Sequence, residues 1–413
     1  MLHKSILGLL IVGLVAGVSP VVSAEEGPVP TPTPTASASP TPEPTPSPTP
    51  TGPILSVVEL KANRSHIVIG ESVRLSGRVD PAIPADDVEI VNAEDRVVRT
   101  VAMSADGSFS TKLSPRFNSR FRARHAGAES SSVPVKVKPK VSVHLGKIRL
   151  FDKATVRGRV RPVVTGGRVE VRLFKNGRRV ASKKTGVRDG GKYRTRLKIK
   201  VPGTYRARAI YSPAVLLTDR DASAKRETQT PSLSVGSKGV YVRSLERRLR
   251  DLGYYLPGAD MYYDYRTSDA MIAFNKVQGR ARVGTVSSST WYALARPRIP
   301  RPRYKSPSHH IEIDQTRQVI LVVKKGKVRN ILHTSTGAGG ATRDGTFTFY
   351  RQVYGYSPNR LYYPSYFDGL RAIHGWPDVP TYPASHGCSR VPMWAATWIQ
   401  GKAAIGERIY VYH

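Results

Sequence analysis

Cysteine is nearly missing from this sequence, because Cys388 is the only one in 413 residues. One cysteine excludes an internal disulfide, and outside a cell such a residue serves as an intermolecular partner or a reactive thiol. No cysteine lies directly after the N-terminal apolar run, which excludes a lipid anchor on a processed cysteine. Beyond that run, no segment is apolar enough to cross a membrane.

Acidic residues are also scarce, with 30 Asp and Glu against 65 Lys and Arg and a formal net charge of +35. Such a charge favours anionic partners, of which nucleic acid, phospholipid headgroups and acidic wall polymers all qualify. The chain is too long for one core, and about three domains are expected. With 39% hydrophobic residues, most of it can fold.

The N-terminus reads as a secretory signal. Lys4 is followed by an apolar run and then by small residues that end at Ala24. This order predicts a signal peptide over residues 1–24, cleaved after Ala24. An uncleaved membrane anchor is the alternative, but the run is short for a span. Secretion argues against nucleic acid as a partner and leaves anionic wall polymers or phospholipid headgroups.

Residues 25–53 are rich in Pro, Thr and Ser, and they predict an extended spacer without a core. An internal repeat follows over residues 54–138 and 139–228. Phe109 and Phe121 lie twelve positions apart in the first copy, as do Tyr193 and Tyr205 in the second. Short runs alternate apolar and polar residues between turn signals, as Val169, Val171 and Leu173 do before Asn176-Gly177.

The repeat therefore predicts two tandem all-β immunoglobulin-like sandwiches. Their outward Arg and Lys residues form either a solvated basic face or a binding face for wall polyanions.

Residues 229–298 change to helical spacing. Gly253 ends the first predicted helix, and Ser288 or Ser289 opens the third. The apolar positions are Val242, Leu245, Leu249 and Leu252, then Ala270, Phe274 and Val277, then Trp291 and Leu294. This stretch resembles the three-helix peptidoglycan-binding domain. It departs from that family at residues 260–265, which puts the binding groove in question, and a purely structural module is the alternative.

Residues 299–308 are interpreted as a Pro/Arg-rich linker to a mainly-β C-terminal domain over residues 309–413. Strands are expected at Ile311 to Asp314, Val319 to Val323 and Arg408 to Tyr412, with a turn at Lys325-Gly326. His309 and His310 fit no ligand or catalytic pattern and are interpreted as linker residues.

The chemistry is expected around Cys388, in the run Ser385-His386-Gly387-Cys388-Ser389-Arg390. A free thiol has a pKa of about 8.5, so it needs a neighbouring base to become a nucleophile. His386 shares a strand face with Cys388 at a spacing of two but is poorly placed to reach both the sulfur and a substrate. His374 comes from another segment and can approach freely. Zinc on His374, His386 and Cys388 is a weaker alternative, because the His-x-Cys spacing is tight for two ligands. An inert structural cluster is another.

Ile373-His374-Gly375 and the run from Ser385 to Arg390 resemble the L,D-transpeptidase catalytic domain. Ser335-Thr336-Gly337 and Thr342 to Phe347 extend the resemblance, with Arg343 where the family has proline. The resemblance implies Cys388 as nucleophile and His374 as proton donor and acceptor. It implies that the Gly375 carbonyl orients the imidazole, that Ser385, His386, Gly387 and Arg390 support the site, and that no cofactor or metal is needed.

Three further expectations concern the surroundings of Cys388. The backbone N–H groups of Gly387 and Cys388 are expected to hold an oxyanion. A helix over Pro392 to Gln400 is expected to favour the thiolate. Arg390 either binds a substrate carboxylate or makes a structural ion pair.

The resemblance implies an enzyme of the bacterial cell wall that acts on peptidoglycan stem peptides. It would release D-alanine from a donor tetrapeptide through a thioester and form a 3→3 cross-link, as a secreted protein of the wall or of the outer face of the cytoplasmic membrane. The alternatives are an L,D-carboxypeptidase of the same fold and a non-catalytic wall-binding protein.

Overall fold

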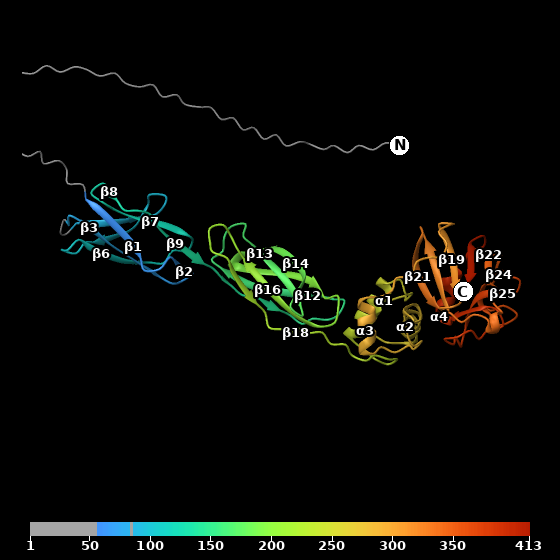
Figure 1. Ribbon diagram of the computed structural model, residues 1–413. Coiled ribbons are helices and arrows are strands. Elements are labelled where there is room, and N and C mark those ends of the chain that lie inside the picture. Colours follow the sequence, from blue (N-terminus) through green and yellow to red (C-terminus); the bar gives the residue numbers. More distant parts are fainter. Residues whose placement is uncertain (1–55, 83–85) are drawn as a thin grey trace, which may run out of the picture. The chain divides into compact units, whose positions relative to one another are not determined.

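The computed structural model describes residues 56–82 and 86–413 (Figure 1). The predicted signal peptide and spacer lie outside these residues. Within them, none of the helices combines the length and the apolar character that a membrane crossing requires. The described chain consists of two β-sandwiches, a helical module and a mainly-β C-terminal domain, which confirms the predicted fold class.

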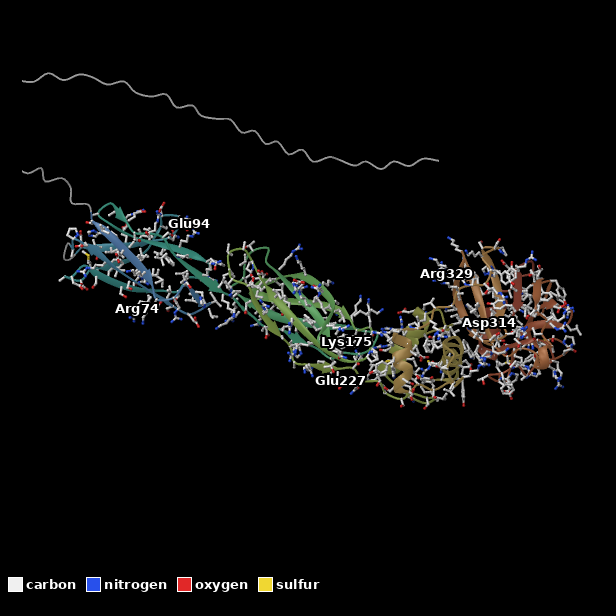
Figure 2. All side chains as sticks on the ribbon, in the orientation of Figure 1. Arg74, Glu94, Lys175, Glu227, Asp314 and Arg329 are labelled. Atoms are coloured by element: carbon white, nitrogen blue, oxygen red, sulfur yellow. The ribbon has the colours of Figure 1, made fainter. Side chains whose placement is uncertain are left out.

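The first sandwich packs a three-stranded sheet, β1-β3-β6, against a sheet in the order β2-β9-β7-β4-β5, with β8 beside β7. Its strands alternate buried apolar residues with exposed polar ones, as Val73 and Leu75 do with Arg74, which extends from the surface (Figure 2). The strands are β1 Val57–Ala62, β2 His66–Val68, β3 Val73–Asp80, β4 Asp87–Val91, β5 Val97–Ala102, β6 Ser108–Leu113, β7 Ser119–His125, β8 Ala128–Glu129 and β9 Val133–Lys138.

The second sandwich repeats this plan with two sheets. In the first sheet, β12 pairs with β10, β11 and β15, and the second sheet has the order β14-β13-β16-β17, with β18 also paired to β16. Val169, Val171 and Leu173 all face the core. The strands are β10 Lys140–Val141, β11 His144–Leu145, β12 Lys153–Arg161, β13 Arg168–Lys175, β14 Arg178–Gly186, β15 Lys192–Lys198, β16 Thr204–Tyr211, β17 Asp219–Ala222 and β18 Arg226–Glu227, with the short 3-10 helix η1 Asp189–Gly191.

Each sandwich contains a glycine that is covered by an aromatic ring from the neighbouring strand. Gly77 pairs with Phe109, and Gly158 pairs with Tyr193. A Cβ atom at Gly77 would lie 2.3 Å from the Phe109 ring, and one at Gly158 would lie 2.4 Å from the Tyr193 hydroxyl oxygen. The repeat therefore keeps glycine at both positions because the ring occupies the space of a side chain.

The helical module contains α1 Val240–Asp251, α2 Tyr265–Gln278 and α3 Ser288–Ala295. Gly253 has a φ of +91° just after α1, as the helix stop predicted there requires. The N-cap of α3 is Ser287, whose side chain forms a capping box with Thr290. The helix thus begins at Ser288, as predicted, and the capping residue is the serine just before it.

Residues 260–265, where the sequence departs from the peptidoglycan-binding family, still form a regular start for α2. Asp264 caps α2 by accepting the Thr267 N–H at 3.0 Å. Tyr263 is fully buried and donates its hydroxyl to the Gly284 carbonyl at 2.6 Å. Tyr262 and Tyr265 remain exposed on the surface of the module.

The C-terminal domain has two sheets, β21-β20-β19-β27-β22 and β23-β24-β25-β26, and one helix, α4. Its apolar core includes Ile311, Ile373, Val391, Ala396 and Ile409. The elements are β19 His309–Asp314, β20 Val319–Lys324, β21 Lys327–His333, η2 Ala338–Gly340, β22 Gly345–Thr348, β23 Arg351–Gln352, β24 Tyr362–Asp368, β25 Arg371–Trp376, β26 Ser389–Pro392, α4 Met393–Gln400 and β27 Arg408–Tyr412.

The interpretation of His309 and His310 as linker residues is wrong. Both belong to β19, and the His310 side chain is fully buried with Nε2 3.1 Å from the Glu312 carboxylate. Glu312 also accepts the backbone N–H groups of Arg303 and Tyr304, at 3.0 and 2.8 Å. The second half of the predicted linker is therefore attached to the domain by a buried carboxylate that no hydrophobic pattern reveals.

Candidate active site

Cys388 lies on the loop that leads into β26. It is a free cysteine of intermediate exposure, and its thiol lies 3.6 Å from the Leu370 carbonyl oxygen. Strand β26 pairs in parallel with β25, with Ile373 opposite Ser389 and His374 opposite Arg390. The parallel pairing brings the segment of His374 beside the segment of Cys388.

The side chains of His374, Trp376 and Arg390 share one face of this strand pair. The imidazole and indole rings meet edge to face at 5.6 Å, and the Arg390 guanidinium lies 5.2 Å from the Trp376 ring centre. Cys388 directly precedes Ser389, the first residue of β26, at the end of the bend that contains Gly387.

His374 is buried, and its Nδ1 lies 3.0 Å from the Gly375 carbonyl oxygen. A carbonyl only accepts, so Nδ1 carries the hydrogen and Nε2 is left as the proton acceptor. Burial, with the nearby Arg390 charge, lowers the pKa of His374 to about 4, although the bond to Gly375 opposes this shift. The imidazole is therefore neutral near neutral pH.

Gly375 is fixed by its surroundings. A Cβ atom there would lie 2.7 Å from Ala396 Cβ and 3.0 Å from the Tyr362 ring. Any side chain would push α4 away from β25, and the carbonyl that orients His374 would move with the strand.

The thiol of Cys388 is not ionised by its surroundings. Burial raises the pKa of Cys388, while the Ala372 N–H and the charges of Arg390 and Arg371 oppose the rise. Helix α4 begins at Met393, close to where it was predicted, but the extended strand β26 stands between it and Cys388. The prediction that the helix favours the thiolate is wrong, because the field of a helix end acts within about one turn and four extended residues span about 13 Å.

Ser385 organises the turn before Cys388. Its buried hydroxyl accepts the Gly387 N–H at 3.0 Å and donates to the Cys388 carbonyl at 2.6 Å. The Gly387 N–H is thus already paired, and its predicted role as an oxyanion donor is wrong. The Cys388 N–H has no acceptor within the described part of the chain and stays available.

Two residues that sequence reasoning did not single out lie beside the turn before Cys388. Thr342 is buried and donates its hydroxyl to the Gly387 carbonyl at 2.8 Å. Arg371 donates Nε to the Ala341 carbonyl at 2.8 Å and forms an ion pair with Asp368 at 2.9 Å. Thr342 had a signal in the matched segment that it opens, whereas Arg371 had none because strand neighbours become visible only in the fold.

His386 is exposed, and no hydrogen bond joins it to any residue that the structure describes. Arg390 makes no ion pair with a described carboxylate, so the structural ion pair weighed for it is absent. Over residues 56–82 and 86–413, no three His, Cys, Asp or Glu side chains converge as a metal site requires. His374, His386 and Cys388 therefore do not form the three-ligand set that zinc would need.

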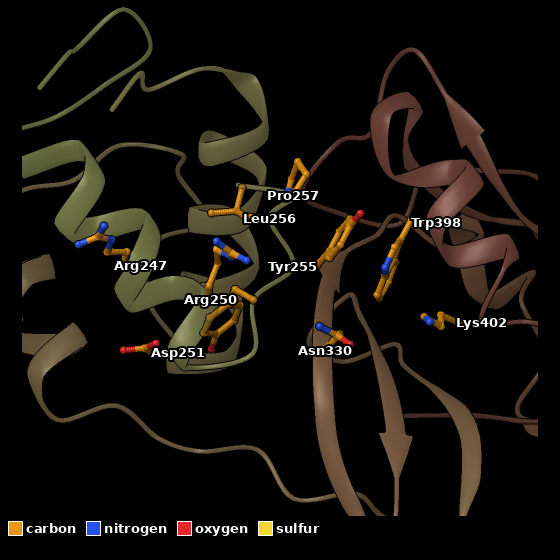
Figure 3. A pocket seen from close by; sticks show the side chains of 10 residues that line it. Arg247, Arg250, Asp251, Tyr255, Leu256, Pro257, Asn330, Trp398 and Lys402 are labelled. Carbon is orange, nitrogen blue, oxygen red and sulfur yellow. The ribbon is translucent and has the colours of Figure 1, made fainter. Parts of the chain in front are cut away.

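A cleft of about 800 Å³ lies between the helical module and the C-terminal domain (Figure 3). Arg247 and Arg250 from α1 line one wall, and Trp398 and Lys402 line the other. Tyr255 stacks on Trp398 with ring centres 3.8 Å apart. The cleft is thus bounded by an aromatic contact that joins the two parts of the chain.

Comparison with known families agrees with this geometry. Residues 308–411 match the L,D-transpeptidase catalytic domain family, and residues 238–294 match a putative peptidoglycan binding domain. An L,D-transpeptidase from Xylanimonas cellulosilytica (residues 123–326) is 37% identical, over 45% of this chain and 98% of that chain, with a TM-score of 0.42. By its C-terminal domain, the chain belongs to the L,D-transpeptidase family.

Two more distant structures are also similar. An L,D-transpeptidase from Stackebrandtia nassauensis is 22% identical over 44% of this chain and 95% of that chain, with a TM-score of 0.29. One from Mycobacterium tuberculosis H37Rv is 16% identical over 26% of this chain and 58% of that chain, with a TM-score of 0.24. No curated protein matches the chain.

Proposed function

We propose that this protein is a cysteine-dependent L,D-transpeptidase that forms 3→3 cross-links between peptidoglycan stem peptides. The observation that supports the proposal is the parallel pairing of β25 with β26, which brings the segment of His374, whose Nε2 is free to accept a proton, beside the segment that follows Cys388. The family and the peptidoglycan-binding module supply the substrate class.

In the first half-reaction, His374 Nε2 takes the thiol proton as Sγ attacks the carbonyl carbon of the third stem residue. The Cys388 N–H stabilises the negative charge that develops on the oxygen. The bond to the terminal D-alanine then breaks, and the departing amine takes the proton from His374. The products are D-alanine and a thioester on Cys388.

In the second half-reaction, the side-chain amine of a neighbouring stem attacks the thioester. Its proton passes to His374, the carbon–sulfur bond breaks, and the thiolate recovers the proton. Because burial raises the pKa of Cys388 and lowers that of His374, both groups are neutral at rest. The proton therefore moves during attack, and the thiolate–imidazolium pair is not formed beforehand.

The remaining assignments follow from this reaction. Arg390 would bind a carboxylate of the stem, since its guanidinium is held over Trp376 and pairs with no carboxylate among the described residues. His386, which is exposed, would contact substrate. The N-terminal signal would export the protein, and the basic sandwich faces would hold it on anionic wall polymers or phospholipid headgroups.

The test uses purified protein with a disaccharide tetrapeptide. Wild type should release D-alanine, accumulate a cross-linked dimer and form a carbapenem adduct on Cys388, and Cys388→Ala should do none of these. Ser306→Ala serves as a matched surface control. Trimmed tripeptide monomers without dimer would replace the proposal by L,D-carboxypeptidase action, and a silent wild type would refute the enzyme.

A further inference from the structure

The loop that carries Cys388, residues 377–388, is held in its first half by side chains from outside the loop. The Val379 carbonyl accepts from His333 Nε2 at 2.8 Å, and the Thr381 carbonyl accepts from Arg282 Nη1 at 2.7 Å. The Tyr382 carbonyl accepts from the Ser335 hydroxyl at 2.6 Å. These three donors hold the first half of the loop, while Ala384 and Ser385, nearer Cys388, donate their backbone N–H groups to the Thr336 carbonyl at 2.8 and 3.0 Å.

One of the donors belongs to the helical module. Arg282 follows α2, and its second terminal nitrogen donates to the Thr316 carbonyl at 2.9 Å. Its guanidinium therefore joins two separate backbone carbonyls of the catalytic domain. A planar fork with fixed donors suits such a bridge better than a flexible ammonium group.

A second chain of contacts starts at Lys276, which is buried at 3% exposure on α2. Its Nζ lies 2.9 Å from the Gln318 carbonyl, 2.8 Å from the Thr334 carbonyl and 2.7 Å from His333 Nδ1. An ammonium group has three hydrogens, and these three acceptors match them. All three partners lie in the catalytic domain.

His333 passes this contact on to the loop. Its Nε2 faces a carbonyl, which can only accept, so Nε2 carries the hydrogen and Nδ1 accepts from Lys276. Burial, with the charge of Lys276, lowers the pKa of His333 to about 3, which agrees with this neutral tautomer. Lys276 thus fixes the imidazole that holds Val379.

Packing alone does not explain why an amine occupies position 276. Burial and the charge of Arg282 lower the pKa of Lys276 to about 6, and Asp269 opposes this change. Because a neutral amine has only two hydrogens for the three acceptors, these hydrogen bonds favour the ammonium form against that shift. Asp269 in turn accepts from Trp394 Nε1 on α4 at 2.8 Å. A methionine would fill the same space without the desolvation penalty of a buried amine, so the hydrogen bonds are the property that the lysine adds.

We propose that Lys276 and Arg282 are positioning residues of the active site, through which the helical module holds the loop of Cys388 in its reactive geometry. The inference rests on the proposed role of Cys388 as nucleophile. It gives the module a second task beside binding the wall, because the catalytic domain alone lacks two of the supports of its own loop.

The test compares Lys276→Met and Arg282→Met with Arg280→Met in the full chain. Arg280 is the matched control, because it lies two residues from Arg282 and its guanidinium contacts Ser289 of its own module. The measurements are kcat and KM for D-alanine release, the rate of carbapenem acylation, binding to purified sacculi, and amide exchange along residues 377–386.

For both test variants, kcat and acylation should fall about 10- to 100-fold, the range expected when a reacting group is misplaced by about 1 Å. KM and sacculus binding should change less than about twofold, since neither residue is placed against substrate. Amide exchange should rise within residues 377–386 and stay unchanged in the sandwiches. Arg282→Lys should restore part of the rate.

Folded variants that keep wild-type acylation, or that lose acylation without faster exchange in the loop, would overturn the proposal. If Lys276→Met does not fold, the Arg282→Met and Arg280→Met pair decides, because both residues are partly exposed. A wild type that forms no thioester would instead refute the proposed function, so the two failures are distinguishable.

Discussion

The interiors of the sandwiches and of the catalytic domain differ in kind. The sandwiches bury mainly Val, Leu, Ala and Tyr side chains, with few buried polar residues such as Ser130 and Ser223. The catalytic domain buries a long series of polar side chains. They include His310, Glu312, Asp314, Gln315, Gln318, His333, Thr334, Ser335, Thr336, Thr342, His374, Ser385, Ser389 and Gln400.

The difference follows from what each interior has to hold. In the sandwiches, strand pairing satisfies the backbone, and side chains only need to fill space. In the catalytic domain, loops approach the site and leave carbonyl and N–H groups without strand partners. Buried hydroxyl, amide and carboxylate groups pair with them instead, as Gln318 does by donating to the Gln315 carbonyl and accepting the Thr336 N–H.

The largest effect is expected at Glu312, whose carboxylate accepts four hydrogen bonds in the polar interior. Glu312→Ala leaves these donors without an acceptor and should lower the free energy of unfolding by about 3 to 5 kcal/mol. Urea unfolding followed by Trp fluorescence measures it, since three of the four Trp residues lie in this domain. Glu407 forms a partly exposed ion pair with His309, so Glu407→Ala should lower the free energy of unfolding by about 1 kcal/mol or less. Equal losses for the two variants would remove the contrast.

The apolar interior should respond to a single methyl group. At Gly158, a Cβ atom would lie 1.8 Å from the Ser142 carbonyl oxygen, so Gly158→Ala should destabilise the second sandwich by about 1 to 3 kcal/mol. Gly186→Ala is the control, because no atom lies within 4 Å of a Cβ there. Hydrogen exchange of residues 139–228 measures the change, and acylation of Cys388 should stay constant. Exchange that is equal in both variants would contradict the account.

The helical module contains one buried acid that tests the same contrast by pH. Burial raises the pKa of Glu246 to about 7, and the Met261 N–H and the Thr267 hydroxyl oppose the rise. The folded pKa exceeds the unfolded one, so the stabilising contribution is present below pH 4.5 and is lost as the pH rises through 7. Glu246→Gln should therefore exceed wild type in stability by about 1 kcal/mol at pH 8 and match it at pH 4, measured by urea unfolding. An equal difference at both pH values would contradict it.

The smallest effect concerns the two reacting groups. Because His374 has a pKa of about 4, kcat/KM should lose half its value only near pH 4. Because burial raises the pKa of Cys388, iodoacetamide should alkylate the thiol slowly until the pH exceeds the usual pKa of a free thiol, about 8.5. A fall of kcat/KM below about pH 6.5, or fast alkylation at pH 7, would indicate a preformed ion pair between the Cys388 thiolate and the His374 imidazolium.

The sequence predicted best where one rule decides the structure. Alternation placed Val169, Val171 and Leu173 in the core, and helical spacing placed Leu245 and Leu249. Cys388 and His374 were singled out by residue type and by family resemblance. These features are local or are shared by many chains.

The misses share another cause, which is side-chain hydrogen bonding that no hydrophobic or helical pattern reveals. His310 was misread because its partners, Glu312 and Pro307, become visible only once the strand and its cover are folded. The Gly387 N–H looked free until Ser385 was seen to take it. Lys276 resembled any helix lysine, because its three acceptors are 42 to 58 positions away.

The half-buried setting of the Cys388 sulfur also bears on how long the protein lasts. Oxidants attack thiolates faster than thiols, and outside the cytoplasm no thioredoxin or glutathione pool repairs the sulfenic acid that results. A thiol whose pKa is raised by burial spends nearly all its time in the protonated form that resists peroxide. The same burial that delays ionisation of Cys388 thereby slows its oxidation.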